Sequence, residues 1–185
     1  MIFTQENEYS AVLDACVLVP VSLCDLLLRL AEEPAMYRPL WSEQILAETV
    51  RAMRTKLHRS ATEAAWRRDQ MMAAFPEAMV PVPLELLKAV ECIPDEDDRH
   101  VLAAAVMARA NAVITQNIKH FPKHCLEQFG VLCQTADEFL VHQFHLSPQL
   151  VLDKLDDQGA GISKDRSYVI GSLRASAPEF CKLVR

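Results

Sequence analysis

"DEDDRHVLAAAVMARANAVITQN", residues 95–117, places a run of acids directly before a long run of small apolar residues. The apolar spacing predicts a helix from about Asp95 to Ala110, followed by the short turn "NA" and a strand "VIT". A helix and a strand joined by so short a turn are typical of proteins in which strands and helices alternate along the chain. This unit therefore favours an α/β fold with a parallel sheet that helices cover on both faces.

The segments before this unit repeat the alternation. "AVLDACVLV" predicts a strand interrupted by Asp14, and Pro20 leads into "VSLCDLLLRLAEE", whose apolar residues recur at helical spacing. Ser42 can cap a helix through "EQILAETVRAMRTKL", and "SATE" has the spacing of a capping box that opens another helix through Phe75. The prolines of "AMVPVP" limit that segment to an edge strand or an extended linker.

The segments after the unit change character near residue 147. "VLCQ" predicts another short strand, and "TADE" has capping-box spacing before a helix through about His145. Beyond it the strand signals stop, and the sequence predicts two helices around a break at Gly159 and Gly161. We therefore expect a sheet-containing domain over residues 1–146 and a helical C-terminal extension over residues 147–185.

Composition excludes several classes of protein. The formal net charge of −6 argues against a protein coated with basic residues, although it permits a local basic patch. The six cysteines form no C-x-x-C pair, and no signal peptide or membrane-spanning stretch is evident, so we expect a reduced, cytoplasmic protein away from membranes. The sequence lacks a glycine-rich phosphate loop and a G-x-S-x-G motif, which disfavours nucleotide-cofactor enzymes and serine hydrolases.

Three acids, Asp14, Glu48 and Asp98, occupy segments that are otherwise apolar or amphipathic. In a parallel sheet, ligands collect outside the carboxyl ends of the strands. Asp14 and the segment from Thr115 to Asn117 both follow predicted strands and should face that edge. Asp98 shares a helical stripe with apolar residues at i+3, i+4 and i+7, so its carboxylate should point toward the sheet. Because buried ionised carboxylates are costly unless paired or metal-bound, this convergence predicts a bound cation.

Simpler explanations remain open for some of these acids. Asp95 and Glu96 lie in a first helical turn, where acids complement the helix dipole or act as N-caps. Aspartate is disfavoured inside strands, so the same explanation does not extend to Asp14. For Asp14 the alternative is a buried, hydrogen-bonded acid without a metal.

Three blocks of sequence carry one of these acids each. They are "VLDACVLVP" with Asp14, "WSEQILAETVR" with Glu48, and "DEDDRHVLAAAVMARANAVITQN" with Asp98, followed by "KHFP". In this order they resemble the PIN domain family, particularly the bacterial virulence-associated protein C-type toxins, over about residues 8–143. The resemblance implies a PIN-like parallel sheet flanked by helices and a metal-dependent endoribonuclease. It places Asp14, Glu48 and Asp98 on family positions that hold Mg²⁺ or Mn²⁺.

The chain departs from the family at the fourth acidic position. Many members have an acid two residues after the Thr or Ser that ends this strand, where this chain has Asn117 after Thr115. An amide oxygen can coordinate or orient a water but adds no charge, so one ion or weaker affinity is expected rather than two firmly held ions. We assign Thr115 and Asn117 to positioning a water or a phosphate.

The resemblance also implies a biological role. It indicates the toxin component of a type II toxin-antitoxin system that cleaves structured RNA such as tRNA or rRNA. A small antitoxin would cover the acidic groove, and a homodimer is a further implication. Asn117 motivates the alternative, a catalytically weak PIN-type module that binds RNA or a protein without cutting.

Basic residues gather between residues 51 and 68 of this acidic chain. They are Arg51, Arg54, Lys56, Arg59, Arg67 and Arg68. We expect the first four to contact the RNA backbone, because phosphate contacts supply most sequence-independent affinity. A solvated helix face is the alternative. Trp66 could stack on an unpaired base, but packing in the core is the favoured interpretation.

The histidines give weaker signals. His120 and His124 are four residues apart beside Cys125, a spacing that could suit zinc on one helix face. Pro122 disturbs that helix, and no second cluster has matching spacing, so zinc is not expected. His100 follows the acid run and is interpreted as a hydrogen-bonded structural residue.

Overall fold

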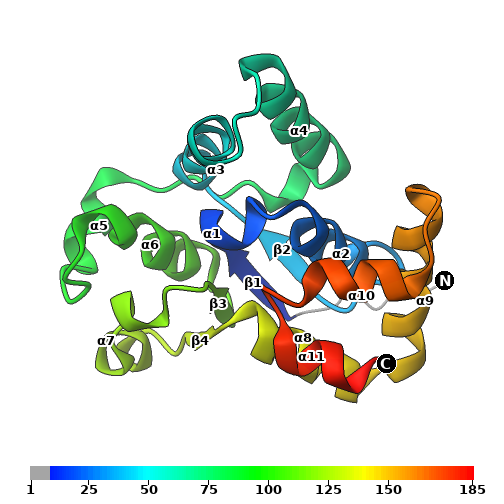
Figure 1. The fold of residues 1–185 in the computed structure, drawn as a ribbon. Coiled ribbons are helices and arrows are strands. Elements are labelled where there is room, and N and C mark those ends of the chain that lie inside the picture. Colours follow the sequence, from blue (N-terminus) through cyan, green and yellow to red (C-terminus); the bar gives the residue numbers. More distant parts are fainter. Residues whose placement is uncertain (1–8) are drawn as a thin grey trace, which may run out of the picture.

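The computed structural model describes residues 9–185 (Figure 1). Within this part of the chain, four short strands form one parallel sheet in the order β2-β1-β3-β4. The strands are β1 (Ser10–Leu13), β2 (Arg38–Leu40), β3 (Ala112–Ile114) and β4 (Leu132–Gln134). In the register of the sheet, Val12 of β1 pairs with Leu40 on one side and Val113 on the other.

Helices surround this sheet and confirm the predicted PIN-like α/β class. They are α1 (Ala15–Leu18), α2 (Val21–Ala31), α3 (Glu43–Lys56), α4 (Ala61–Ala74), α5 (Leu84–Ala89), α6 (Arg99–Ala108), α7 (Lys123–Gln128), α8 (Ala136–Leu146), α9 (Pro148–Gly161), α10 (Arg166–Leu173) and α11 (Pro178–Leu183). Short 3₁₀ turns are η1 (Pro76–Ala78), η2 (Glu96–Asp98) and η3 (Ile118–His120). Helix α6 packs on β1 and β3, α2 on β2, and α8 on β4. Strands β1 and β3 are buried throughout because helices cover them.

The predicted strand "AVLDACVLV" is wrong in its second half. Strand β1 ends at Leu13, and Asp14 is the extended residue that begins helix α1, with φ −69° and ψ 153°. The backbone N–H of Asp14 still donates to the carbonyl of Ile114 (3.0 Å), which fixes it at the end of β3. The apolar residues of the short helix α1 and its C-cap Val19 supplied the misleading strand signal. Asp14 therefore lies at the carboxyl edge of the sheet and not within a strand.

Other elements differ from the prediction because contacts between residues distant in sequence determine their secondary structure. The segment "AMVPVP" forms only one isolated bridge, between Met79 and Trp41, and helix α5 follows it. Strand β2 and helix α7 were not predicted. The C-terminal region contains three helices rather than two, and both glycines lie inside α9. A Cβ on Gly159 would lie 2.7 Å from the carbonyl oxygen of Lys164, so glycine allows the chain to fold back here.

Both predicted capping boxes are confirmed. The Ser60 hydroxyl accepts from the Glu63 N–H (3.2 Å), and the Glu63 carboxylate accepts from the Ser60 N–H (2.9 Å). Thr135 and Glu138 make the same reciprocal bonds, at 3.1 and 2.8 Å, at the start of α8. The starts of α4 and α8 were predictable because a capping box depends on two residues that are three positions apart in the sequence.

The C-terminal helices share one hydrophobic core with the rest of the protein. Helix α9 packs on α2, and α11 packs on α8. Gln158 Nε2 donates to the Ser22 carbonyl (2.9 Å), and the buried Lys154 Nζ donates to the carbonyls of Glu32 and Glu33 at the end of α2, each at 3.4 Å. The predicted domain division falls between α8 and α9 and stays a prediction.

No helix among the described residues is both long and apolar enough to cross a bilayer. All six cysteines lie in this part of the chain and are free thiols. Residues 1–8 belong to the predicted domain 1–146 and to the segment considered for a signal peptide, and they lie outside the described residues.

Candidate active site

A pocket of about 500 Å³ lies at the edge where β1 and β3 end. Its lining includes Asp14, Glu48, Asp98 and Asn117. These residues come from four places: the start of α1, the middle of α3, the end of η2 and the start of η3. The structure thus brings four of the predicted site residues together at the carboxyl edge of the sheet, where parallel strands place ligands.

Asp14 is held by two donors on one carboxylate oxygen. The Thr115 hydroxyl donates to Asp14 Oδ2 (2.6 Å), and the Cys16 thiol donates to the same oxygen (2.9 Å). Thr115 is fully buried, and its hydroxyl accepts from the Asn117 N–H (3.0 Å). The hydroxyl of Thr115 thus acts on the pocket through Asp14. Among the described residues, no hydrogen bond reaches Asp14 Oδ1, which remains available to a ligand.

Sequence reasoning missed Cys16 as part of this site. Burial and the nearby charge of Asp14 raise the pKa of the Cys16 thiol to about 12, so it stays protonated and remains a donor. Its sulfur also accepts from the backbone N–H of Gln116 (3.1 Å). A cysteine in an apolar run gives no sign of such contacts, because a thiol ordinarily behaves there as a small hydrophobe.

Asp98 faces His120 at the entrance of the pocket. His120 Nδ1 lies 2.6 Å from Asp98 Oδ2 and 3.9 Å from Asp95 Oδ2, and one ligand atom from each of these residues lies within 4.8 Å of the others. Burial raises the pKa of Asp98, the contact with His120 opposes that shift, and the charges of Asp14 and Asp95 add to it. The carboxylates are therefore close enough to repel one another.

The acids before α6 divide into two roles. Asp95 Oδ1 accepts from the Asp97 N–H (3.1 Å) and caps η2, which agrees with the N-cap explanation for Asp95. Asp98 makes no such cap and lines the pocket instead. His120, considered above with His124 for zinc, contacts this acidic cluster, whereas His124 lies 3.5 Å from the Cys125 sulfur.

Glu48 is held by a buried histidine. His100 is 2% exposed, and its Nε2 lies 3.1 Å from Glu48 Oε1. Neither ring nitrogen of His100 makes a hydrogen bond among the described residues, so the interpretation of His100 as a hydrogen-bonded residue is wrong. Arg51 lies 3.9 Å from the same oxygen. Within residues 9–185, no lysine or arginine forms an ion pair with Asp14 or Asp98, so these acids are not neutralised by such cations.

The comparison with known families agrees with this geometry. Residues 10–119, more than half of the chain, match the family described as "PIN domain", and this range contains all four acidic and amide residues of the pocket. The chain belongs to the PIN domain family. A relative of this PIN domain, "Putative ribonuclease VapC50" of Mycobacterium tuberculosis, is 47% identical over 49 residues. That match covers 26% of this chain and 29% of the relative, and no solved structure matches significantly.

Basic residues flank the acidic pocket of the PIN domain. Arg51 and Lys56 line the pocket itself, and Arg51, Arg54 and Arg59 line an adjoining depression of about 690 Å³. Arg59 also lies 3.6 Å from Glu63, in an exposed ion pair. The residues predicted to contact RNA therefore lie along α3 and just beyond it, next to the acids.

Two other residues of the basic segment have different places. Trp66 is 63% exposed, so its predicted packing in the core is wrong. Arg67 donates to the carbonyls of Leu18 (2.7 Å) and Val19 (3.1 Å), at the end of α1. Because α1 begins directly after Asp14, Arg67 fixes the segment that carries this acid.

We expect Arg67→Ala to lower the free energy of unfolding by about 2 kcal/mol, because two carbonyls lose a charged donor. Denaturant titration of the purified protein measures this change. Arg68→Ala is the matched control: within residues 9–185, Arg68 pairs only with its exposed neighbour Asp69, so a change within about 0.5 kcal/mol is expected. Equal losses in the two variants would contradict this role of Arg67.

Proposed function

We propose that this PIN domain protein is a metal-dependent endoribonuclease and the toxin component of a type II toxin-antitoxin pair, which cleaves structured RNA such as tRNA or rRNA. The proposal rests on one observation: Asp14, Glu48 and Asp98 line the same pocket. The name of the mycobacterial relative and the family match support nuclease activity.

The donor set fits a divalent cation. Mg²⁺ and Mn²⁺ prefer oxygen ligands, and Asp14, Glu48 and Asp98 offer carboxylate oxygens around one pocket, where the charge of Asp14 opposes ionisation of Asp98. We propose these three residues as ligands, directly or through water. When bound, such an ion lowers the pKa of a coordinated water and stabilises charge on the scissile phosphate. Asn117 adds no charge, which supports one ion rather than two.

The remaining site residues orient these ligands. The proposed catalytic set is Asp14, Glu48, Asp98, Thr115 and Asn117. Thr115 and Cys16 fix one oxygen of Asp14, so its other oxygen is preorganised toward the pocket. Asn117 lines the pocket and is proposed to position a water or a phosphate oxygen through its amide.

The RNA backbone is proposed to lie along α3. Arg51 and Lys56 at the pocket, and Arg54 and Arg59 beyond it, can contact successive phosphates without reading sequence. Their position beside the acids matters, because RNA phosphates would otherwise approach an uncompensated negative surface.

The proposed partner is a small antitoxin that inserts a basic side chain into the acidic pocket, where opposite charge favours it. We also propose a cytoplasmic location, supported by six free cysteines and the absence of disulfides between them. The homodimer implied by the family resemblance stays a prediction.

Cleavage of total tRNA by the purified protein with Mn²⁺ tests the function. We expect cleavage that EDTA abolishes and that Glu48→Gln reduces by about a hundredfold or more, because the variant removes a charged ligand. Glu43→Gln is the control, since Glu43 is exposed at the start of the same helix and does not line the pocket.

The same assay distinguishes the nuclease from the alternative function, a module that binds RNA without cutting it. Cleavage that persists in EDTA and in Glu48→Gln would identify a contaminant and contradict the assignment. Wild-type protein that binds tRNA but leaves it intact with Mn²⁺ or Mg²⁺ would instead support the catalytically weak module, which Asn117 favours.

A further inference from the structure

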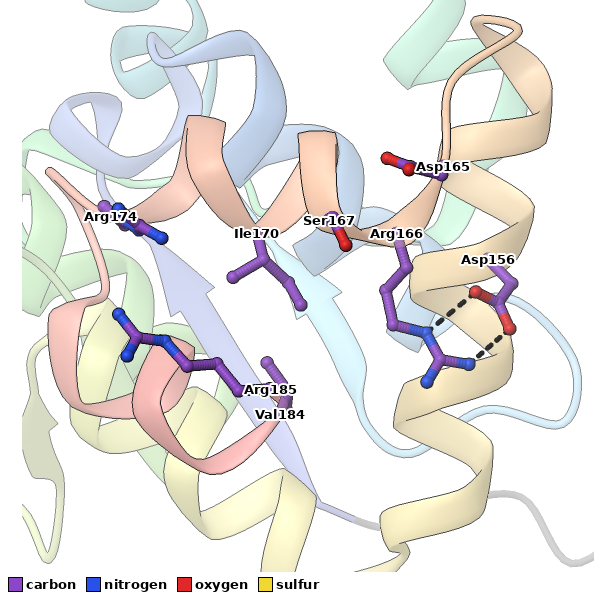
Figure 2. A pocket seen from close by; sticks show the side chains of 8 residues that line it. All are labelled: Asp156, Asp165, Arg166, Ser167, Ile170, Arg174, Val184 and Arg185. Carbon is purple, nitrogen blue, oxygen red and sulfur yellow. Dashed lines mark hydrogen bonds and ion pairs between the residues drawn. The ribbon is translucent and has the colours of Figure 1, made fainter.

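A second pocket, of about 590 Å³, lies among the C-terminal helices (Figure 2). Its walls carry Arg166, Arg174 and Arg185, together with Asp156 and Asp165. This region lies outside residues 10–119, so the family match does not account for it. Three guanidinium groups around one hollow are unusual on a chain whose formal net charge is −6.

The two acids of this pocket are already engaged. Asp156 binds Arg166 through two parallel contacts, one of which is 2.8 Å long (Figure 2). Asp165 caps α10 by accepting from the Tyr168 N–H (2.8 Å). In contrast, Arg174 is exposed and forms no ion pair or hydrogen bond with any described side chain or carbonyl.

Arg185 is a second cation of this pocket. It is exposed and, like Arg174, has no ion-pair partner among residues 9–185. Figure 2 shows Arg174 at the end of α10 away from the Arg166–Asp156 pair, and Arg185 reaching toward that same end from beyond α11. Burial and the charge of Asp137 raise the pKa of the Cys181 thiol, and the charges of Arg174 and Arg185 oppose that shift, so both arginines lie close to the same part of α11. The Asp137 carboxylate itself accepts from the backbone N–H groups of Glu179 and Phe180. The pocket therefore has two guanidinium groups available to an anion.

The spacing of the cations suits an extended anion. Arg166 and Ile170 lie on α10 and Arg174 is its C-cap; they follow at intervals of four residues and line the same pocket. Eight residues of helix span about 12 Å, a distance that covers more than one phosphate of a nucleic-acid strand. Guanidinium groups also match the geometry of phosphate oxygens.

The connection between α10 and α11 contacts the catalytic loop, residues 115–117. Gln116 lies between Thr115 and Asn117, and its Nε2 donates to the carbonyl of Ser176 (3.1 Å). Ser176 lies in the connection between α10 and α11, two residues after Arg174. An RNA strand that leaves the acidic pocket over Gln116 would therefore reach Arg174 next.

We propose that Arg174 and Arg185 bind the RNA backbone beyond the catalytic loop, as a second contact in addition to the basic residues of α3. The inference rests on the proposed function, since it extends the path of the same substrate. It gives the C-terminal helices a direct part in substrate binding. RNA is favoured over an acidic protein because the substrate must pass this loop and the chain is otherwise negatively charged.

RNA binding by the full chain in an Asp14→Asn background, which prevents cutting, tests the proposal. Fluorescence anisotropy with labelled tRNA and a single-stranded 20-mer gives affinity across a salt series. We expect Arg174→Ala combined with Arg185→Ala to weaken binding roughly tenfold at 0.15 M salt. For single strands, the slope of log affinity against log salt should fall by about 1.4, or about 0.7 for each arginine replaced.

Arg38→Ala is the matched control. Arg38 is exposed at the amino end of β2, away from the edge that carries the acids, so affinity and slope should stay unchanged. Unchanged affinity and slope in the double variant, with the same melting temperature as the parent, would overturn the proposal. A change in log affinity for Arg38→Ala that is half or more of the change in the double variant would overturn it too, because the effect of each arginine would then reflect net charge alone.

Cleavage by the protein with intact Asp14 separates this inference from the proposed function. If wild-type protein does not cut tRNA with Mn²⁺ but the double variant binds RNA more weakly, the nuclease assignment fails and the RNA contact stands. If wild-type protein cuts and the double variant binds normally, the contact fails and the nuclease assignment stands.

Discussion

Asp14→Asn is expected to slow metal-dependent cleavage by at least roughly a thousandfold without disturbing the fold. The side chain keeps its shape, and its amide oxygen can still accept from Thr115 and Cys16. The amide NH₂ then faces the pocket, where it presents hydrogens in place of the free carboxylate oxygen. Loss of this ligand removes several kcal/mol of electrostatic stabilisation, and each 1.36 kcal/mol corresponds to about a tenfold change in rate.

Single-turnover cleavage rates and Mn²⁺ binding by calorimetry measure the effect of Asp14→Asn. Asp25→Asn is the control, because Asp25 is partly exposed on α2 and pairs with Arg29 at 3.1 Å, away from the acidic pocket. We expect the control to cleave and bind Mn²⁺ as the wild type does. A rate for Asp14→Asn within tenfold of wild type would show that Asp14 is a structural acid.

Asp98→Asn is expected to lose activity by about a hundredfold or more and to stabilise the metal-free protein at neutral pH. Burial raises the pKa of Asp98, and the charges of Asp14 and Asp95 add to the shift despite the contact with His120. A carboxyl whose pKa is higher in the folded state costs stability once it is ionised. This cost grows as pH rises through the Asp98 pKa and is absent at strongly acidic pH. Asparagine removes the cost and can still accept from His120.

Thermal unfolding in EDTA between pH 7 and pH 3 measures this effect. The melting temperature of Asp98→Asn should exceed that of wild type at pH 7, and the difference should shrink as pH falls. Added Mn²⁺ should raise the melting temperature of the wild type more than that of the variant, because it binds the folded wild type. Asp97→Asn, at an exposed neighbouring position, should change neither value. A collapse of the Asp98→Asn melting temperature in EDTA would contradict the prediction.

Local sequence patterns were sufficient for the fold class and for several helix ends. The capping boxes at Ser60 and Thr135 depend on residues three positions away, and the helix before β3 follows from its apolar spacing. Local patterns failed just after Asp14, where the apolar residues of the short helix α1 imitate a strand. They also failed at Trp66, whose large apolar ring is exposed. The secondary structure of a short apolar segment and the exposure of a single side chain depend on tertiary packing. The periodicity of apolar residues gives no information about that packing.

The candidate site was predictable only in part for the same reason. The three acids could be placed at one edge because parallel strands end on the same side of a sheet. Their supporting contacts join distant segments: Thr115 is 101 residues from Asp14, and His100 of α6 meets Glu48 of α3. Cys16 is close to Asp14 in sequence, but nothing in its apolar surroundings indicates a polar role. The structure therefore adds the residues that hold the ligands in place.

The Lys154 bridge to the end of α2 joins residues 122 positions apart. During synthesis, a nascent chain that has emerged only through α8 lacks this bridge and the apolar cover that α9 and α11 provide. We expect the end of α2, and the turn that leads from it to β2, to become fixed only after α9 has left the ribosome.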